Sequence, residues 1–287
     1  HDLLSFTSAS PVEWLRGAPG QPRVRRVQAP GHPYLGEGFV AMAHRGGWLS
    51  IEDRSRENTW YAFAQAVAEG YRYIETDIRT TADGQVVAFH DPQLGGVTDS
   101  LGSVSSLTYA ELANVRVGGS DPIPLLSELL AEFPTTRFNI DLKDDASVAA
   151  LPSLLAAADA HERVCIASFS SARLRRFRRL APDVLTATTP GEVLWYAAAV
   201  GFRRWFAFGG GQVLQVPARI LGERVDLVRP DVIAAAHAAG RAVHVWTVDA
   251  EDEMNRLIDL GVDGLISNEI GPLKRVLTER GLWKGHQ

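Results

Sequence analysis

The sequence lacks the features of a disulfide-bonded, membrane-spanning or nucleic-acid-binding protein. It has a single cysteine, Cys165, so no disulfide can form within the chain. No stretch of about 20 apolar residues is present, which excludes an ordinary transmembrane helix. A net charge of −5 argues against nucleic-acid or anionic-membrane partners, which select basic surfaces. We expect a soluble, cytoplasmic protein, although a start at His1 rather than methionine leaves open a removed N-terminal segment.

Several catalytic signatures are also missing. The sequence holds no serine-nucleophile elbow, no glycine loop that cradles nucleotide phosphates, and no Cys/His pattern with zinc-ligand spacing. Gly46-Gly47 and Gly209-Gly210-Gly211 do not match a dinucleotide fingerprint. The motifs thus give no support to a serine hydrolase, a nucleotide-binding enzyme or a zinc enzyme.

From residue 39 onward, short apolar segments alternate with longer helical patterns. Nine segments are typical of strands: Phe39–Ala43, Tyr73–Ile78, Val86–Phe89, Phe138–Leu142, Val164–Ser168, Val184–Ala187, Val213–Val216, Ala242–Val248 and Gly264–Ser267. Helical patterns lie between most of them: Thr59–Glu69, Leu125–Glu132, Ala146–Ala158, Ser171–Leu180, Glu192–Ala199, Pro230–Ala239 and Glu251–Leu260. This alternation predicts an α/β fold, one (β/α)8 barrel domain over residues 39–287, after an irregular, proline-rich lead-in over residues 1–38.

The number of strand segments exceeds that of a barrel by one. Residues 80–84 join two strand segments directly, and Asp83-Gly84 is a hairpin signal. We therefore expect one hairpin arm to be added to the barrel or to lie antiparallel within it. Residues 92–124 predict an insertion, with a loop and a short helix, near the barrel mouth.

Polar side chains gather where the first four strand segments end. They are His44 and Arg45 after the first, Glu75 and Asp77 on one face of the second, His90 after the third, and Asn139, Asp141 and Lys143 along one face of the fourth. Barrel enzymes place their chemistry at the carboxyl ends of the strands, so these residues form the candidate site. The other histidines considered, His161, His237, His244 and His286, are interpreted as structural.

Glu75 and Asp77 stand among apolar residues, where burying two like charges is costly unless something compensates them. A divalent cation compensates well, and an all-carboxylate site favours Mg²⁺, Ca²⁺ or Mn²⁺ over Zn²⁺. Structural ion pairing to Arg45 or Lys143 is the alternative. Two histidines beside a hard cation suit phosphodiester chemistry, because one imidazole can take a proton from the nucleophile while the other protonates the leaving alkoxide.

In their order along the chain, these residues resemble the glycerophosphodiester phosphodiesterase family. The matching segments are Ala43-His44-Arg45-Gly46-Gly47, Glu57-Asn58-Thr59, Glu75-Thr76-Asp77, Thr81-Ala82-Asp83-Gly84, Val87-Ala88-Phe89-His90-Asp91, Ile123-Pro124-Leu125, Asn139-Ile140-Asp141-Leu142-Lys143, Ser168-Phe169, Val245-Trp246-Thr247-Val248 and Gly261-Val262-Asp263-Gly264. The resemblance implies a metal-dependent enzyme that cuts small-molecule glycerophosphodiesters to glycerol 3-phosphate and an alcohol. It leaves the oligomeric state open.

The resemblance also implies a role for each site residue. His44 and His90 would be the acid–base pair, Glu75, Asp77 and Asp141 the metal ligands, Arg45 and Lys143 the phosphate-binding cations, Trp246 a substrate contact at the mouth, and Glu57 a support that orients Arg45 or His44. A core aromatic is the alternative interpretation of Trp246, and a helix-start glutamate that of Glu57.

Four departures from the family pattern stand out. Asp141 is one methylene shorter than the usual Glu, Arg56 stands in place of a proline, residues 93–98 lack an arginine, and Ser267-Asn268-Glu269 replaces a Thr-Asp pair. None is expected to touch the two histidines or the first two ligands. We therefore expect an active enzyme with shifted specificity.

Two other functions are left open. A phospholipase-D-like hydrolase of lysophospholipid or sphingolipid headgroups needs an apolar tunnel or a lipid-facing loop, for which the candidates are Trp48, Leu49, Trp195, Phe202 and Trp205. A catalytically silent barrel that only binds phosphorylated ligands or a partner protein does not need a proton-transfer pair, so the two histidines count against it.

Overall fold

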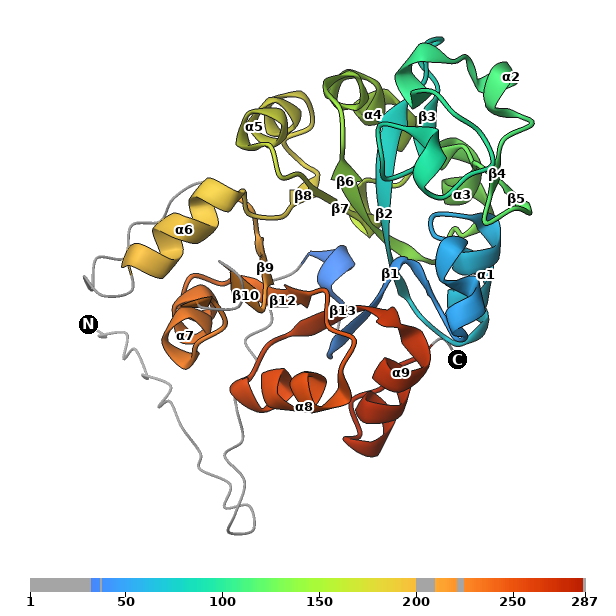
Figure 1. Cartoon of the computed structure of the whole chain (residues 1–287). Helices are drawn as coiled ribbons and strands as arrows, with labels where there is room; N and C mark the ends of the chain where they lie inside the picture. The colour runs from blue at the N-terminus through green and yellow to red at the C-terminus, as the bar shows by residue number, and fades with distance from the viewer. Residues whose placement is uncertain (1–31, 37, 200–209, 221–224, 286–287) are drawn as a thin grey trace, which may run out of the picture.

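Eight parallel strands build a barrel in the part of the chain that the computed structural model describes, residues 32–36, 38–199, 210–220 and 225–285 (Figure 1). They are β1 (Val40–Trp48), β2 (Tyr73–Thr80), β6 (Arg137–Leu142), β7 (Val164–Ala167), β8 (Leu185–Thr186), β9 (Val213–Pro217), β12 (Ala242–Trp246) and β13 (Gly264–Glu269). The predicted (β/α)8 barrel is therefore confirmed. Most of the predicted lead-in lies outside the described residues.

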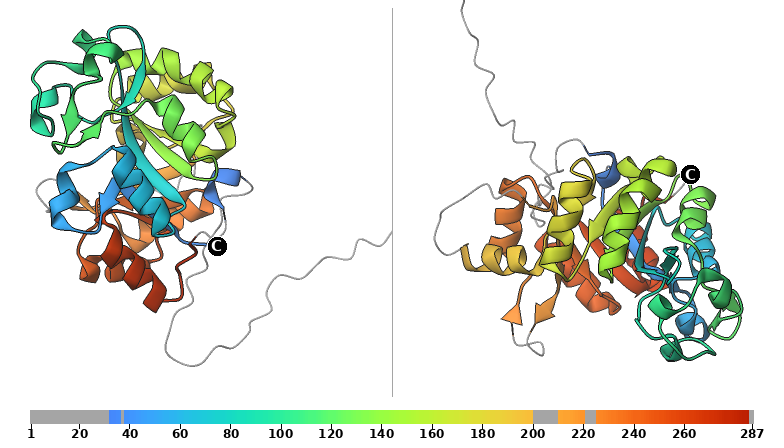
Figure 2. Two further views of the ribbon diagram at one scale, coloured as in Figure 1. Left: turned by 90° about the vertical axis from the view of Figure 1, so that its right-hand side faces the viewer. Right: turned by 90° about the horizontal axis from the view of Figure 1, so that it is seen from above.

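The barrel closes between β8 and β9. The strands are paired in the order β8-β7-β6-β2-β1-β13-β12-β9, and a parallel bridge joins Ala187 to Val213 across the remaining gap. Helices lie outside the strands (Figure 2): α1 (Trp60–Ala68), α3 (Leu126–Glu132), α4 (Asp145–Ala157), α5 (Ser171–Leu180), α6 (Pro190–Ala199), α7 (Pro230–Ala238), α8 (Glu251–Leu260) and α9 (Ile270–Glu279). None of the helices in the described ranges is long and apolar enough to cross a membrane.

The ninth predicted strand is an antiparallel arm attached to the barrel. β3 (Val86–Ala88) turns back after Gly84, whose φ is +82°, and pairs antiparallel with the end of β2. The insertion follows, with α2 (Tyr109–Leu112) and a small sheet of β4 (Arg116–Val117) and β5 (Asp121–Pro122) around its own apolar cluster. The predicted arm and insertion are both confirmed.

The helical pattern of the sequence does not reveal α9. Gly271 and Pro272 stand in its first turn, and these residue types usually interrupt helices. Proline is tolerated there because the first amides of a helix have no intrahelical partner. The short pair β10 (Arg219–Ile220) and β11 (Val225–Asp226) also carries too few residues for a periodic signal.

Alternate residues of the strands fill the barrel interior. Below the mouth this interior is apolar, and Met42, Cys165, Leu185 and Ile266 are buried in one cluster. Cys165 is the small buried hydrophobe that its apolar setting predicts, and burial raises the pKa of its thiol.

His244 is a polar exception in this interior. Its side chain is fully buried, and neither ring nitrogen has a hydrogen-bond partner. Burial lowers the pKa of His244 to about 4, against a smaller opposing contribution from the charge of Asp263. The ring is therefore neutral in the folded protein near neutral pH.

We expect His244 to make the protein acid-sensitive. Its pKa is about 4 in the fold against 6.5 ordinarily, so the unfolded chain binds more protons between these values. The contribution of neutral His244 to the free energy of unfolding is therefore fully present above pH 6.5. It is lost as the pH drops toward 4, by about 3 kcal/mol in all. We expect the free energy of unfolding, measured in urea, to fall less between pH 7 and pH 5 for His244→Leu than for wild type. Parallel pH profiles would contradict this account.

Candidate functional site

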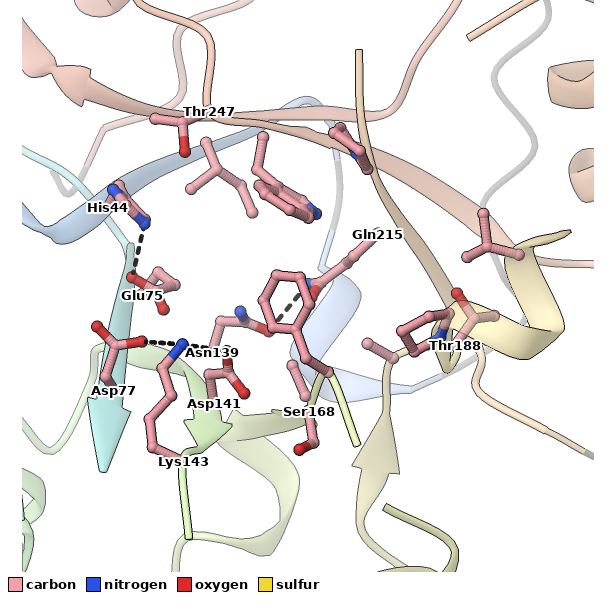
Figure 3. A pocket seen from close by; sticks show the side chains of 18 of the residues that line it. His44, Glu75, Asp77, Asn139, Asp141, Lys143, Ser168, Thr188, Gln215 and Thr247 are labelled. Carbon is pink, nitrogen blue, oxygen red and sulfur yellow. Dashed lines mark hydrogen bonds and ion pairs between the residues drawn. The ribbon is translucent and has the colours of Figure 1, made fainter. Parts of the chain in front are cut away.

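A cavity of about 490 Å³ opens at the carboxyl end of the barrel, and its lining is divided into two halves. The charged half is His44, Arg45, Glu75, Asp77, His90, Asp141 and Lys143. The apolar half is Ala167, Phe169, Ala187, Pro190, Val193, Leu194, Pro217, Leu227, Trp246 and Ile266. In Figure 3 the acidic residues of β2 and β6 lie on one side of the cavity, and Thr188 and Gln215 on the other. The site residues predicted from the sequence therefore line one cavity, except Glu57, which lies outside the lining and contacts Arg45.

The end of β1 turns sharply, and this turn aims Arg45 at two carboxylates. Arg45 has a φ of +53°, in the left-handed region. Its backbone N–H donates to Glu75 Oε2 at 3.0 Å, and its Nε lies 3.0 Å from Asp77 Oδ2. Its Nη1 donates to both carboxylate oxygens of Glu57 at 2.9 Å. Glu57 therefore contacts Arg45, the first of the two partners considered for it.

Among the three predicted metal ligands, Asp77 has the most polar partners. Its side chain is 2% exposed, and its two oxygens face different cations, with Oδ1 lying 2.9 Å from Lys143 Nζ. Asn58 Nδ2 also donates to Oδ2 at 3.1 Å. Burial opposes the charge of Asp77, but Lys143 and Arg45 outweigh burial and lower the pKa of its carboxyl. Asp77 is therefore ionised.

Glu75 and Asp141 are less fully compensated. Lys143 Nζ lies 2.7 Å from Asp141 Oδ2, but Asp141 Oδ1 is buried without a hydrogen-bond partner. Burial raises the pKa of Asp141 in spite of Lys143. Burial, and then the charge of Asp77, raises the pKa of Glu75 well above its ordinary value. Ionising all three carboxylates would therefore place more negative charge in the charged half than Arg45 and Lys143 neutralise.

The two predicted histidines line the cavity from different elements of the fold. His44 belongs to the barrel strand β1, and its Nε2 lies 3.7 Å from Glu75 Oε2. Burial, and then the charge of Arg45, lowers the pKa of His44 to about 4, so the ring is neutral near pH 7. His90 follows β3, the added hairpin arm, rather than a barrel strand. Its Nδ1 lies 2.7 Å from Asp91 Oδ1.

Two of the polar residues beside the predicted site are not predicted from the sequence. Asn58 accepts hydrogen bonds from Thr76 Oγ1 at 2.8 Å and from the Asp77 amide at 3.3 Å, and so it holds the end of β2. Its place in the family-like segment Glu57-Asn58-Thr59 was an available signal. Gln215 donates to Asn139 Oδ1 at 2.9 Å across the barrel. No local sequence pattern predicts this contact.

The expectation that none of the four departures touches a histidine is wrong. Asn268 Oδ1 lies 2.6 Å from His44 Nδ1. The two residues are 224 positions apart in sequence, but β1 and β13 are neighbours in the barrel. The substituted pair at the end of β13 therefore contacts a candidate catalytic residue directly.

Of the residues considered for lipid binding, the two whose side chains the structure describes do not line the cavity. Trp48 donates its Nε1 to Glu269 at 3.1 Å and is absent from the lining, as is the exposed Leu49. Phe202 and Trp205 lie outside the described residues, as does the side chain of Trp195. The apolar half instead carries Phe169 and Trp246, whose ring centroids lie 5.4 Å apart in an edge-to-face arrangement.

The cations occupy positions between the carboxylates. In the described ranges, no three Asp, Glu, His or Cys side chains lie close enough together to hold a metal ion. Instead, Arg45 and Lys143 both pair with Asp77, and Lys143 also pairs with Asp141. The ion pairing considered as an alternative to metal binding of Glu75 and Asp77 is thus present for Asp77.

This barrel, with histidines, carboxylates and cations converging at its mouth, defines a class of enzyme that acts on phosphoryl groups. Residues 44–272 match the model of the glycerophosphoryl diester phosphodiesterase family, and the chain belongs to that family. The predicted enzyme class, a glycerophosphodiester phosphodiesterase, is confirmed.

Individual relatives agree with the family assignment. A Mycobacterium tuberculosis protein named as glycerophosphodiester phosphodiesterase 2 is 38% identical over 86% of this chain and 94% of its own length. A lysophospholipase D of Rattus norvegicus is 26% identical over 82% of this chain and 85% of its own length. The crystal structure of a glycerophosphoryl diester phosphodiesterase from Silicibacter pomeroyi has a TM-score of 0.72 and 26% identity, and covers 88% of this chain and 100% of its own.

We expect Lys143 to stabilise the fold in metal-free buffer. Lys143→Met leaves Asp77 and Asp141 buried without this cation, which should lower the free energy of unfolding by about 3 kcal/mol. Lys274→Met, which removes the more exposed pair with Glu69, is the matched control and should cost less than about 1 kcal/mol. Urea unfolding measures both. If both variants lower the free energy of unfolding by the same small amount, Lys143 does not compensate the charges of Asp77 and Asp141.

Proposed function

We propose that this protein hydrolyses glycerophosphodiesters to glycerol 3-phosphate and an alcohol, with the phosphoryl group bound in the charged half of the cavity. The divided lining supports this orientation most directly. Arg45 and Lys143 are the cations that line the charged half among the described residues, and an anionic phosphodiester would exchange part of their carboxylate contacts for its own oxygens. The rest of the substrate would then extend toward Phe169 and Trp246.

The two histidines would transfer protons. His44 is neutral and presents Nε2 to the cavity, while His90 has a carboxylate neighbour in Asp91. One imidazole takes the proton of the attacking oxygen, and the other protonates the departing alcohol oxygen as its bond to phosphorus breaks. Arg45 and Lys143 would stabilise the charge that grows on the remaining phosphoryl oxygens.

The carboxylates are also of the donor type that a hard divalent cation prefers, and they would have to move closer together than they lie here to hold one. Glu75, Asp77 and Asp141 offer only oxygen donors, Asp141 Oδ1 is buried without a partner, and the raised pKa of Glu75 indicates a charge that the protein does not fully compensate. These three residues would hold Mg²⁺, Ca²⁺ or Mn²⁺, which when bound supplies further stabilisation of phosphoryl charge. Lys143 and Arg45 would then give up part of their contacts with Asp77 and Asp141.

A second candidate activity is phospholipase-D-like hydrolysis of lysophospholipids. The apolar half favours it, because Phe169 is 63% and Leu194 59% exposed beside the cavity, where an acyl chain could pack. The rat relative is itself named a lysophospholipase D. A lysophosphatidylcholine substrate, assayed beside glycerophosphocholine, separates the two activities.

The activity and the histidines can be tested together. Wild type should release glycerol 3-phosphate from glycerophosphocholine, and His44→Ala and His90→Ala should each lower kcat by ~10²–10⁴-fold. A nitrophenyl diester, whose leaving group needs no protonation, should rescue the variant that lacks the acid. His161→Ala, outside the cavity lining, is the control. Absence of glycerol 3-phosphate from wild type, or near-normal rates in both variants, would overturn the proposal.

Metal binding has a readout that does not depend on turnover. Titration calorimetry should detect Mg²⁺ or Ca²⁺ binding to wild type, with weaker binding to Glu75→Gln and Asp141→Ala, because each change removes a charged donor. Asp145→Ala, which removes an exposed carboxylate on α4, should bind like wild type. EDTA should abolish activity. If Asp141→Ala binds metal normally, Asp141 is not a ligand.

A further inference from the structure

We propose that Asn268, held by Asp249, is a positioning residue that fixes His44 in the tautomer with its proton on Nδ1. The three residues lie on neighbouring parts of the barrel, because β13 pairs with β1 on one side and with β12 on the other. Asp249 follows β12, Asn268 is on β13, and His44 is on β1. The inference rests on the proposed function, in which His44 transfers a proton.

The contacts of Asp249 set the orientation of the Asn268 amide. The Asp249 carboxylate accepts from the Asn268 backbone N–H at 2.8 Å, from Ser267 Oγ at 2.9 Å and from Asn268 Nδ2 at 2.8 Å. An ionised carboxylate can only accept hydrogen bonds, so the donor end of the Asn268 side chain must face Asp249. The oxygen of the same amide therefore faces the other way, toward His44.

That orientation decides the tautomer of His44. Asn268 Oδ1 lies 2.6 Å from His44 Nδ1, and an amide oxygen only accepts, so Nδ1 must carry the hydrogen. In a neutral imidazole, Nε2 is then left with its lone pair, and Nε2 is the nitrogen 3.7 Å from Glu75. The ring is thus prepared to accept a proton at Nε2 on the side of the charged half.

The backbone around this contact is also shaped for it. Gly47 has a φ of +64°, and a side chain there would place its Cβ 2.8 Å from the backbone oxygen of Asn268. Glycine therefore permits the close approach of β1 to Asn268. Asp249 is exposed, and its charge acts on the pKa of His44 less than burial and Arg45 do, so its main contribution to His44 is geometric.

The tautomer assigns the two histidines different roles. His44 Nε2 takes a proton from the attacking water molecule as the water oxygen bonds to phosphorus. The bond from phosphorus to the departing alcohol breaks, and that oxygen takes its proton from His90. Loss of Asn268 should therefore impair the same step as loss of His44, and a good leaving group should not compensate for it.

Substitutions at Asn268 and Asp249 test the proposal, first by removing each polar group and then by exchanging the two. Asn268→Leu removes the acceptor, and Asp249→Ala removes its anchor; each should lower kcat by ~10–100-fold with little change in KM. Asn268→Asp alone places two carboxylates together and should also be impaired. The double variant Asn268→Asp/Asp249→Asn keeps an acceptor for His44 Nδ1 and restores the side-chain bond between the two positions, now donated from position 249, so it should regain most of the lost kcat. Asp252→Asn, an exposed carboxylate of α8, is the control.

Two further readouts separate positioning from a structural role. A nitrophenyl diester should rescue His90→Ala but neither His44→Ala nor Asn268→Leu. ¹⁵N NMR of the histidine rings should show His44 with its proton on Nδ1 in wild type and without that fixed tautomer in Asn268→Leu. A wild-type His44 protonated on Nε2, or full kcat in Asn268→Leu, would overturn the proposal. Full activity of His44→Ala would instead overturn the proposed function, and the NMR result would still decide the tautomer.

Discussion

The structure depends on burying three carboxylates side by side at one end of a β-barrel. Strand alternation turns Glu75 and Asp77 inward on β2 and Asp141 inward beside them on β6, where Asp77 and Asp141 are register partners. Burying this much like charge would be prohibitive without cations. Arg45 and Lys143 supply them, and both contact Asp77. The left-handed turn at Arg45 and the Asn58 contacts are consequences of the same requirement.

The two histidines depend on different parts of the fold. His44 is fixed by the barrel itself, through β1 and its neighbour β13. His90 instead follows an antiparallel arm whose residues Val87 and Phe89 belong to the apolar cluster of the insertion. The Phe89 amide also donates to the Asp77 carbonyl at 2.9 Å, which folds the arm over the end of β2. The insertion therefore positions one member of the proposed acid–base pair.

The fold was largely predictable because its signals are local. Each buried strand forms a short apolar run, and the polar residues at the ends of β1, β2 and β6 interrupt those runs at fixed positions. Asn268 and Gln215 could not be placed, because their partners His44 and Asn139 are 224 and 76 positions away and no periodic pattern links them. The choice between ion pairing and metal binding also depends on where the Lys143 ammonium group lies relative to Asp77 and Asp141. The order of residues along a strand does not predict that position.

The central claim is that the phosphoryl group of the substrate binds in the charged half of the cavity, with the remainder toward the apolar half. A crystal structure of the protein with glycerol 3-phosphate and a divalent cation tests this most directly. We expect phosphate oxygens within hydrogen-bond distance of Arg45 or Lys143 and close to His44 and His90. Phosphate bound against Phe169 and Trp246, or outside this cavity, would contradict the account.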